Sequence, residues 1–206
     1  MRRRLAILLA VVLVLGAAFG VRQAMRAPAR LSDVRDDLDL PASFEASLSG
    51  SWGDYDLPDR FAMQLEGGRP VRYRAEHGPF VTLIDVSGRE MLVFAPEEGE
   101  ALRTDVGDAL EDMALLTLGA KGSDARIVGR ETVDDAECWI VHPSDGSTRF
   151  WIGREDGLVR RVEGDLGSLS LAYTRVNAVP AEEFELPEGT TVREMDEAFG
   201  EMVEER

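Results

Sequence analysis

Apolar and polar side chains alternate along most of the chain that follows residue 42. In the first such segment Phe44, Ala46, Leu48, Gly50 and Trp52 share one side, and glutamate and serine residues fill the positions between them. A period of two is typical of a β-strand with one buried face. Further alternating segments bring the expected number of strands to about ten: 61–66, 71–76, 79–86, 90–95, 126–133, 137–142, 150–152, 158–163 and 168–176.

Turns that contain glycine separate several of these segments. Gly67-Gly68, Ser87-Gly88 and Asp156-Gly157 each stand between two alternating runs. Glycine supplies the positive φ that tight hairpin turns need. Because strands joined by short turns pair with each other, the pattern predicts an antiparallel meander, mainly β with some α structure.

Three segments have helical periodicity instead. Residues 31–40 begin with Ser32 as an N-cap and stop before Pro41. A mid-chain helix begins at Thr104 or Asp105, ends at Gly119 and presents an apolar side that includes Leu110 and Met113. The acidic tail 193–206 carries a narrow apolar stripe, which we expect either to pack on the exterior of the domain or to cover the open end of the sheet. That stripe is formed by Val192, Met195, Phe199 and Met202.

The N-terminus has the organisation of an export signal. Three arginines precede a stretch without charge from Leu5 to Val21, and Ala18-Phe19-Gly20 offers small residues for cleavage. The stretch also approaches the length of a membrane-spanning helix, about 20 residues. Residues 1–21 are therefore a cleaved signal peptide or an N-terminal anchor, and residues 22–41 are a spacer with the short helix. Either alternative places the domain outside the cytoplasm, in the periplasm or cell envelope, touching the inner membrane only through residues 5–21 if they are uncleaved.

The exported part of the chain is strongly acidic. Loss of residues 1–20 removes three arginines and no acid, which leaves 20 basic and 39 acidic residues and a net charge of −19. This balance argues against nucleic acid as a partner and against docking on anionic lipid. The lone cysteine, Cys138, allows no internal disulfide and lies too far along the chain for a lipid-attachment motif.

The sequence does not select a catalytic centre. His77 and His142 fall in different strands, without a cysteine or a third histidine at metal-ligand spacing. Nucleophile elbows, phosphate loops and dinucleotide fingerprints are missing from the sequence. Acidic pairs such as Asp134-Asp135 lie in predicted turns, where charged side chains are ordinarily exposed to water. We expect a protein that is not an enzyme and that needs neither a metal nor another cofactor.

The order of motifs from residue 129 onward resembles the LolA/LolB-like superfamily of lipoprotein carriers. The shared features are a Gly-x-Glu-x-Val strand at 129–133, the Cys138-Trp139 pair, a Trp-Ile-x-x-x-x-Gly-Leu hairpin at 151–158 and a Phe-x-Leu-Pro-x-Gly motif at 184–189. Upstream, residues 81–103 are similar to the strand pair that precedes the family's helix. The resemblance covers most of residues 42–192, which we therefore treat as one domain.

This resemblance implies a fold and a use. The fold is a strongly curved antiparallel sheet, a half-open β-barrel, with a mid-chain helix and terminal helices over its concave side. In the carriers that side is an apolar cavity that shields the acyl chains of a lipid or lipoprotein. Other relatives sense envelope stress, so the alternative is a membrane-tethered sensor with an envelope protein as its partner.

The predicted apolar cavity combines the resemblance with the alternation of the strands. For any one aromatic residue, packing in an ordinary core is the competing interpretation. The residues that we expect to line the cavity are Trp52, Phe61, Met63, Leu65, Tyr73, Leu110, Met113, Trp139 and Trp151.

Overall fold

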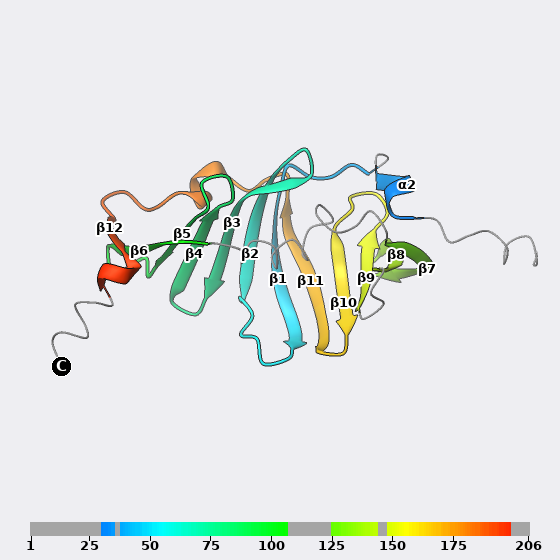
Figure 1. Cartoon of the computed structure of the whole chain (residues 1–206). Helices are drawn as coiled ribbons and strands as arrows, with labels where there is room; N and C mark the ends of the chain where they lie inside the picture. The colour runs from blue at the N-terminus through cyan, green and yellow to red at the C-terminus, as the bar shows by residue number, and fades with distance from the viewer. Residues whose placement is uncertain (1–29, 36–37, 107–124, 144–147, 199–206) are drawn as a thin grey trace, which may run out of the picture.

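The computed structural model describes residues 30–35, 38–106, 125–143 and 148–198, and these build one 12-stranded sheet (Figure 1). Its strands lie in the order β12-β6-β5-β4-β3-β2-β1-β11-β10-β9-β8-β7. The elements, in chain order, are α2 (Ser32–Arg35), β1 (Ser43–Trp52), β2 (Arg60–Glu66), β3 (Arg69–His77), β4 (Phe80–Asp85), β5 (Glu90–Phe94), β6 (Glu100–Asp105), β7 (Arg126–Val133), β8 (Ala136–His142), β9 (Thr148–Gly153), β10 (Val159–Gly164), β11 (Gly167–Val176), the 3₁₀ helix η4 (Ala181–Phe184) and β12 (Thr191–Glu194).

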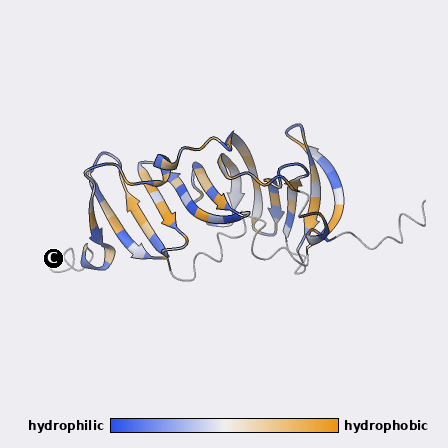
Figure 2. Cartoon of the chain, turned by 90° about the horizontal axis from the view of Figure 1, so that it is seen from above, coloured by the Kyte–Doolittle hydropathy of each residue, from blue (hydrophilic) through white to orange (hydrophobic). Residues whose placement is uncertain are grey.

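Two antiparallel meanders make up the sheet. Strands β1 to β6 pair in sequence order, and so do β7 to β11, while the pairing of β1 with β11 joins the two meanders. The last strand, β12, is the exception, because it pairs in parallel with β6. The sheet bends along its length, and its edge strands β7 and β12 lie at opposite ends (Figures 1 and 2). The prediction of a curved, unclosed and mainly antiparallel sheet is confirmed.

The predicted hairpin turns are also present. Gly67, Gly68 and Gly157 have φ values of 57°, 74° and 66°, which L-residues with a Cβ rarely adopt. The predicted strands appear at the expected places, with the segment 79–86 beginning as β4 at Phe80. The pattern of neighbouring residues was therefore sufficient to predict these turns and strands.

Two strands differ from the prediction. Glu100–Asp105 forms β6, although Thr104 and Asp105 were expected to begin a helix. Val192 was assigned to the tail helix but lies in β12, and helical structure begins only at residue 195. Both strands are held by pairing: Thr191 lies opposite Glu100, and Glu194 lies opposite Arg103. Such a contact between distant segments leaves no periodic signal in either one.

The short N-terminal helix is smaller than predicted. α2 covers Ser32–Arg35, and Leu38 to Leu40 are not helical. The side chain of Asp33 accepts a hydrogen bond from the Arg30 backbone N–H at 3.0 Å, which satisfies a donor at the start of the helix. The predicted signal or anchor at 1–21, the mid-chain helix beyond Val106 and the tail beyond residue 198 lie outside the described residues. No helix among the described segments is long and apolar enough to span a membrane.

Each side of the sheet has its own character, as the alternating colours of neighbouring residues in Figure 2 show. The apolar face is the side that carries Phe44, Phe61 and Tyr73, and it holds the larger hydrophobic cluster. The back face is the opposite side, where Glu45, Arg60 and Arg74 project. A second, smaller cluster on the back face consists of Val81, Leu83, Phe94 and Ala101, with Leu92 and Leu186 packed against it.

Candidate functional site

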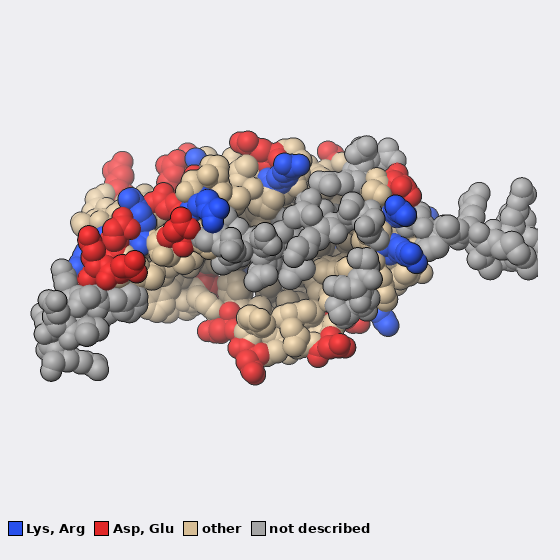
Figure 3. Space-filling view, in the orientation of Figure 1, with Lys and Arg blue, Asp and Glu red and all other residues tan. Residues whose placement is uncertain are grey.

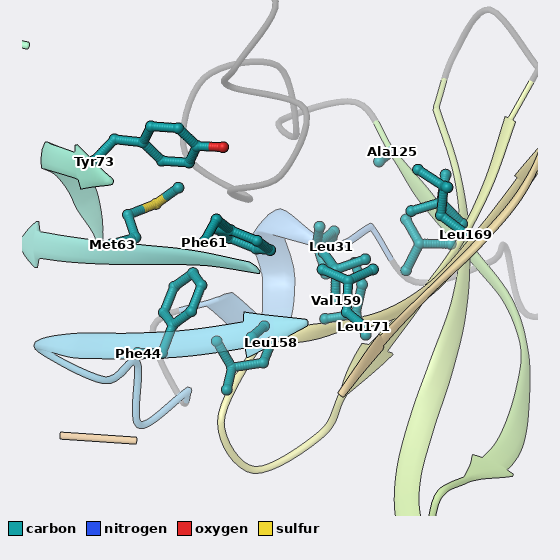
Figure 4. Close-up of a cluster of buried hydrophobic side chains, with 14 of the residues drawn as sticks. Leu31, Phe44, Phe61, Met63, Tyr73, Ala125, Leu158, Val159, Leu169 and Leu171 are labelled. Carbon is teal, nitrogen blue, oxygen red and sulfur yellow. The ribbon is translucent and has the colours of Figure 1, made fainter. Parts of the chain in front are cut away.

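The β1–β4 half of the apolar face is built by cross-strand pairs. Phe44 lies opposite Met63, Met63 lies opposite Tyr73, and Tyr73 lies opposite Ile84, so one row crosses the four strands. The Phe44 and Phe61 rings meet edge to face at 5.8 Å. Figure 4 shows Phe61, Met63 and Tyr73 close together. Because opposite residues of antiparallel strands share a face, the alternation in each strand accumulates into a continuous apolar surface.

The β8–β11 half continues this surface. Leu171 lies opposite Leu48 of β1, and Leu169 lies opposite Val162 of β10. Further along, Ile152 of β9 lies opposite Trp139 of β8. All these side chains except the half-buried Leu48 are at most 8% exposed. From the N-terminal segment, Leu31 packs into the same cluster, with Val34 and Leu38 partly buried beside it.

The structure brings most of the predicted cavity residues together. Phe61, Met63, Tyr73 and Trp139 are buried members of the apolar cluster. Trp52 and Leu65 are partly buried and pack against it. Leu110 and Met113 lie outside the described residues. Among the seven that the structure describes, Trp151 alone is separated from the others, because it lies on the back face.

Trp151 points away from the apolar face as a consequence of the β8–β9 register. Ile152 is opposite Trp139, so its neighbour Trp151 projects to the other side of the sheet. There its indole N–H donates to Glu131 Oε2 at 2.7 Å, and the Arg161 guanidinium lies 3.9 Å from the ring centroid. The hydrogen bond from Trp151 is the main reason that the pKa of Glu131 is lowered. Trp151 thus belongs to a polar cluster and not to the predicted cavity.

The back face also holds an ion-pair network that sequence reasoning did not find. The carboxylate of Glu45 is only 5% exposed and contacts Arg60, at 3.0 Å, and Arg175. Arg60 also donates two hydrogen bonds to Glu76, and Arg74 donates to the same carboxylate. In the sequence these residues occupy the polar positions of alternating strands, which ordinarily face solvent.

The chain segment after β11 covers this network. Glu183 of η4 accepts a hydrogen bond from Arg175 at 2.8 Å, and its backbone carbonyl accepts one from Arg74 at 3.1 Å. Phe184, the last residue of η4, is buried. The network therefore fastens the C-terminal connector to the back face and leads the chain toward β12.

Acidification should weaken this network. Burial of Glu45 opposes ionisation, but hydrogen bonds from Arg175 and Thr174 outweigh it and lower the pKa of that carboxyl. The pKa of Glu76 is lowered mainly by its hydrogen bond from Arg60. Both folded values lie below the ordinary 4.5, so the unfolded chain binds more protons and stability should fall as the pH drops below about 4.5. Urea unfolding at pH 7, 5, 4 and 3 measures the slope, and stability that is unchanged or higher at pH 3 would contradict the prediction.

A cavity of about 150 Å³ lies on the back face between the connector and strands β3 to β5. Leu83, Leu92 and Leu186 contribute apolar wall, and Arg72 and Asp85 contribute charge. Asp85 is already partnered, since Ser87 Oγ and the Gly88 N–H donate to it at 2.6 and 2.9 Å. The cavity is small, and its lining contains both apolar and charged side chains.

The charged groups at the β5–β6–β12 end form exposed ion pairs. Arg103 lies 2.7 Å from Glu90 and 3.5 Å from Glu194, and Arg193 lies 3.4 Å from Glu100. Figure 3 shows acidic and basic side chains intermingled at this end of the molecule. Exposed pairs of this kind contribute little to stability. They show that the short edge strand β12 presents charged side chains to solvent.

The other chemically reactive side chains are dispersed. Within the described ranges, three or more histidine, cysteine or acidic residues never gather as a metal site would require. Cys138 is fully buried, and burial raises the pKa of its thiol. A raised pKa disfavours the reactive thiolate, so Cys138 acts as a small apolar residue of the back face.

No protein-family model and no curated protein matches the chain. Solved structures of similar shape include an uncharacterized conserved protein from Thermus thermophilus, which is 15% identical, with a TM-score of 0.47 over 80% of this chain and 96% of that one. LprF from Mycobacterium bovis is 12% identical over 78% of this chain and 95% of its own, with a TM-score of 0.44. The lipoprotein LppX from Mycobacterium tuberculosis is 11% identical over 75% and 93%, with a TM-score of 0.41.

Proposed function

We propose that this protein is an extracytoplasmic carrier or buffer that binds an acyl-chain or other apolar ligand on the apolar face of its sheet. The observation that carries the proposal is the continuous apolar surface from Ile84 on β4 to Trp139 on β8, which crosses both meanders. The motif resemblance to LolA/LolB-like carriers supports the same use. In this proposal the ligand is a lipid or the acyl group of a lipoprotein, and the protein is not an enzyme.

Apolar contact alone can supply useful affinity on such a surface. Each methylene group moved out of water contributes about 0.8 kcal/mol, so ten of them contribute about 8 kcal/mol before the cost of association. A dissociation constant of 1 μM corresponds to about 8 kcal/mol. A chain of about 12 to 16 carbons therefore reaches micromolar affinity without any charged contact. The strong acidity of the domain is compatible with this mode, because no electrostatic attraction is needed.

Native mass spectrometry of the full chain expressed in a bacterial envelope tests the proposal. We expect bound species whose masses match lipids, and we expect a fluorescent fatty acid to titrate onto the delipidated protein with saturation. The proposal would be overturned if no lipid were found bound to the protein and the fluorescent fatty acid showed no saturable binding. That result would favour the protein-interaction alternative, in which the sheet recognises an envelope partner.

A charge on the apolar face should reduce binding of the fluorescent fatty acid. Leu48 is half-buried and lies opposite Leu171, so Leu48→Glu places a carboxylate on the proposed contact surface. We expect at least about a tenfold loss of affinity, since an unpaired charge is costly to bury. The matched control is Ser49→Glu, which adds the same charge at the next residue, on the other face. Equal affinities for the two variants, both verified as folded by circular dichroism, would contradict the prediction.

A further inference from the structure

Three exposed apolar side chains lie at one end of the sheet. Tyr55, in the β1–β2 connection, is 71% exposed, and Leu166, in the β10–β11 turn, is 53% exposed. Phe80, which follows the β3–β4 turn, is 51% exposed. The three turns follow one another along the lower edge of the sheet in Figure 1. Together these residues form what we call the tip patch.

Tyr55 and Leu166 are close neighbours within the tip patch. The Gly53 N–H donates a hydrogen bond to the backbone carbonyl of Leu166 at 2.6 Å. A Cβ at Gly53 would lie 3.7 Å from Leu166 Cδ2 and 3.8 Å from Tyr55 Cδ2, so both side chains lie over the same glycine. Trp52 and Leu57, which flank Tyr55 in the sequence, are partly buried against the larger apolar cluster. The tip patch therefore adjoins one end of the apolar face.

Polar contacts hold the β1–β2 connection in place. The Gly78 N–H donates a hydrogen bond to Asp59 Oδ2 at 3.2 Å. His77 Nε2 lies 3.1 Å from the backbone carbonyl oxygen of Asp56. Both contacts attach the connection to the β3–β4 turn, beside Phe80. Because the connection is already held, covering it with a partner costs less conformational entropy than ordering a free loop would.

The rim of the tip patch is acidic. The segments 52–59 and 164–168 contain four aspartates and neither lysine nor arginine. All four are exposed, and Figure 3 shows acidic side chains over the β1–β2 and β10–β11 turns. These residues are Asp54, Asp56, Asp59 and Asp165. Their charge repels the anionic lipids of a membrane surface and attracts lysine and arginine side chains. An apolar centre with a charged rim is typical of a protein–protein interface.

We propose that the tip patch binds a protein partner whose own contact surface is apolar at its centre and carries lysine and arginine around it. Tyr55, Phe80 and Leu166 supply the apolar contact, and the aspartates of the rim pair with the partner's cations and orient it. A second copy of this chain is disfavoured as the partner, because it would bring the same aspartates to the contact. The inference goes beyond the proposed function, since this binding needs no apolar ligand on the sheet.

A synthetic helical peptide made only of leucine and lysine tests this assignment, because it presents an apolar stripe bordered by cations. Fluorescence anisotropy of the labelled peptide gives its dissociation constant for the full chain. We expect Leu166→Ser to raise that constant about three- to tenfold, since part of a leucine contact is lost. The matched control is Val128→Ser, because Val128 is also 53% exposed but lies on β7. The control should leave the dissociation constant unchanged.

The acidic rim is tested by a second pair of variants. The double variant Asp54→Asn/Asp56→Asn should weaken peptide binding about three- to tenfold at low salt, and the difference from the parent should shrink at about 1 M salt. Its control is Asp134→Asn/Asp135→Asn, which removes two exposed acids from the β7–β8 turn. This control should change the dissociation constant less than about twofold. Circular dichroism verifies that each variant is folded.

Three results would overturn the inference. The first is that the parent does not bind the peptide with saturation, and the second is that the variants of the tip patch and its rim bind it as tightly as their controls do. The third is that the full chain sediments with phosphatidylcholine vesicles and loses this property in Leu166→Ser, while peptide binding is unchanged. That result would show that the tip patch contacts a membrane and not a protein.

Discussion

Alanine at Gly50 or Gly167 is expected to lower the free energy of unfolding by about 3 kcal/mol or more. The two glycines lie on the adjacent strands β1 and β11, with φ values of 114° and 147°. A Cβ at Gly50 would overlap the backbone carbonyl oxygen of Ser168, and a Cβ at Gly167 would overlap that of Ser51. Backbone atoms cannot rotate away as a side chain does, so the junction between the two meanders would have to shift.

Gly78→Ala is the control for the junction variants. Gly78 also has a positive φ, 52°, but a Cβ there would meet nothing within 4 Å. Its substitution should therefore cost only the backbone strain of a left-handed residue, about 1 kcal/mol. Urea denaturation of the three variants gives the comparison. If Gly50→Ala or Gly167→Ala lowered the free energy of unfolding no more than Gly78→Ala does, then β1 and β11 would tolerate a wider separation.

Glu45→Gln is expected to cost about 2 to 3 kcal/mol of stability. The substitution keeps the size of the side chain but removes the charge that Arg60 and Arg175 share. Both guanidinium groups are partly exposed, which is why we expect less than the roughly 3 to 5 kcal/mol typical of a fully buried pair. The thermal unfolding midpoint should fall accordingly.

The comparison for this variant is Glu137→Gln. Glu137 pairs with Arg154 on the surface, where its side chain is 72% exposed, and such a pair is worth about 0 to 1 kcal/mol. The Glu45→Gln variant should also lose part of the acid sensitivity of the parent below pH 4.5, because one of the carboxyls whose pKa is lowered in the folded state is gone. If the two variants lost the same free energy of unfolding, the ion pairs of the buried Glu45 would stabilise the fold no more than an exposed pair does.

The sequence was most informative where structure depends on neighbours in the chain. Alternation in β1 places Phe44, Ala46 and Leu48 on one face, and glycines mark the hairpins, so the buried side of β1 and the hairpin turns could be predicted. Trp151 shows the limit of this reasoning. The alternation separates it from Phe150 and Ile152, but only the pairing of Ile152 with Trp139 decides which face carries the core.

Features that depend on distant segments could not be predicted in this way. Glu45 was expected at a solvated position, yet it is buried because Arg175 and the connector with Glu183 pack over it. Strand β12 forms because it pairs with β6, although the whole second meander and the connector lie between the two strands in the chain.

The joining of β1 to β11 has a consequence for the order of folding. Glu45 and Arg175, which meet at this junction, are 130 residues apart in the chain. Each meander contains mostly local pairings and can form early, whereas the junction must wait until the last long strand is available. Until then β1 and β11 are both open edges, and each half of the apolar face is incomplete. The emerging polypeptide is therefore most vulnerable to aggregation in the interval before β11 reaches β1.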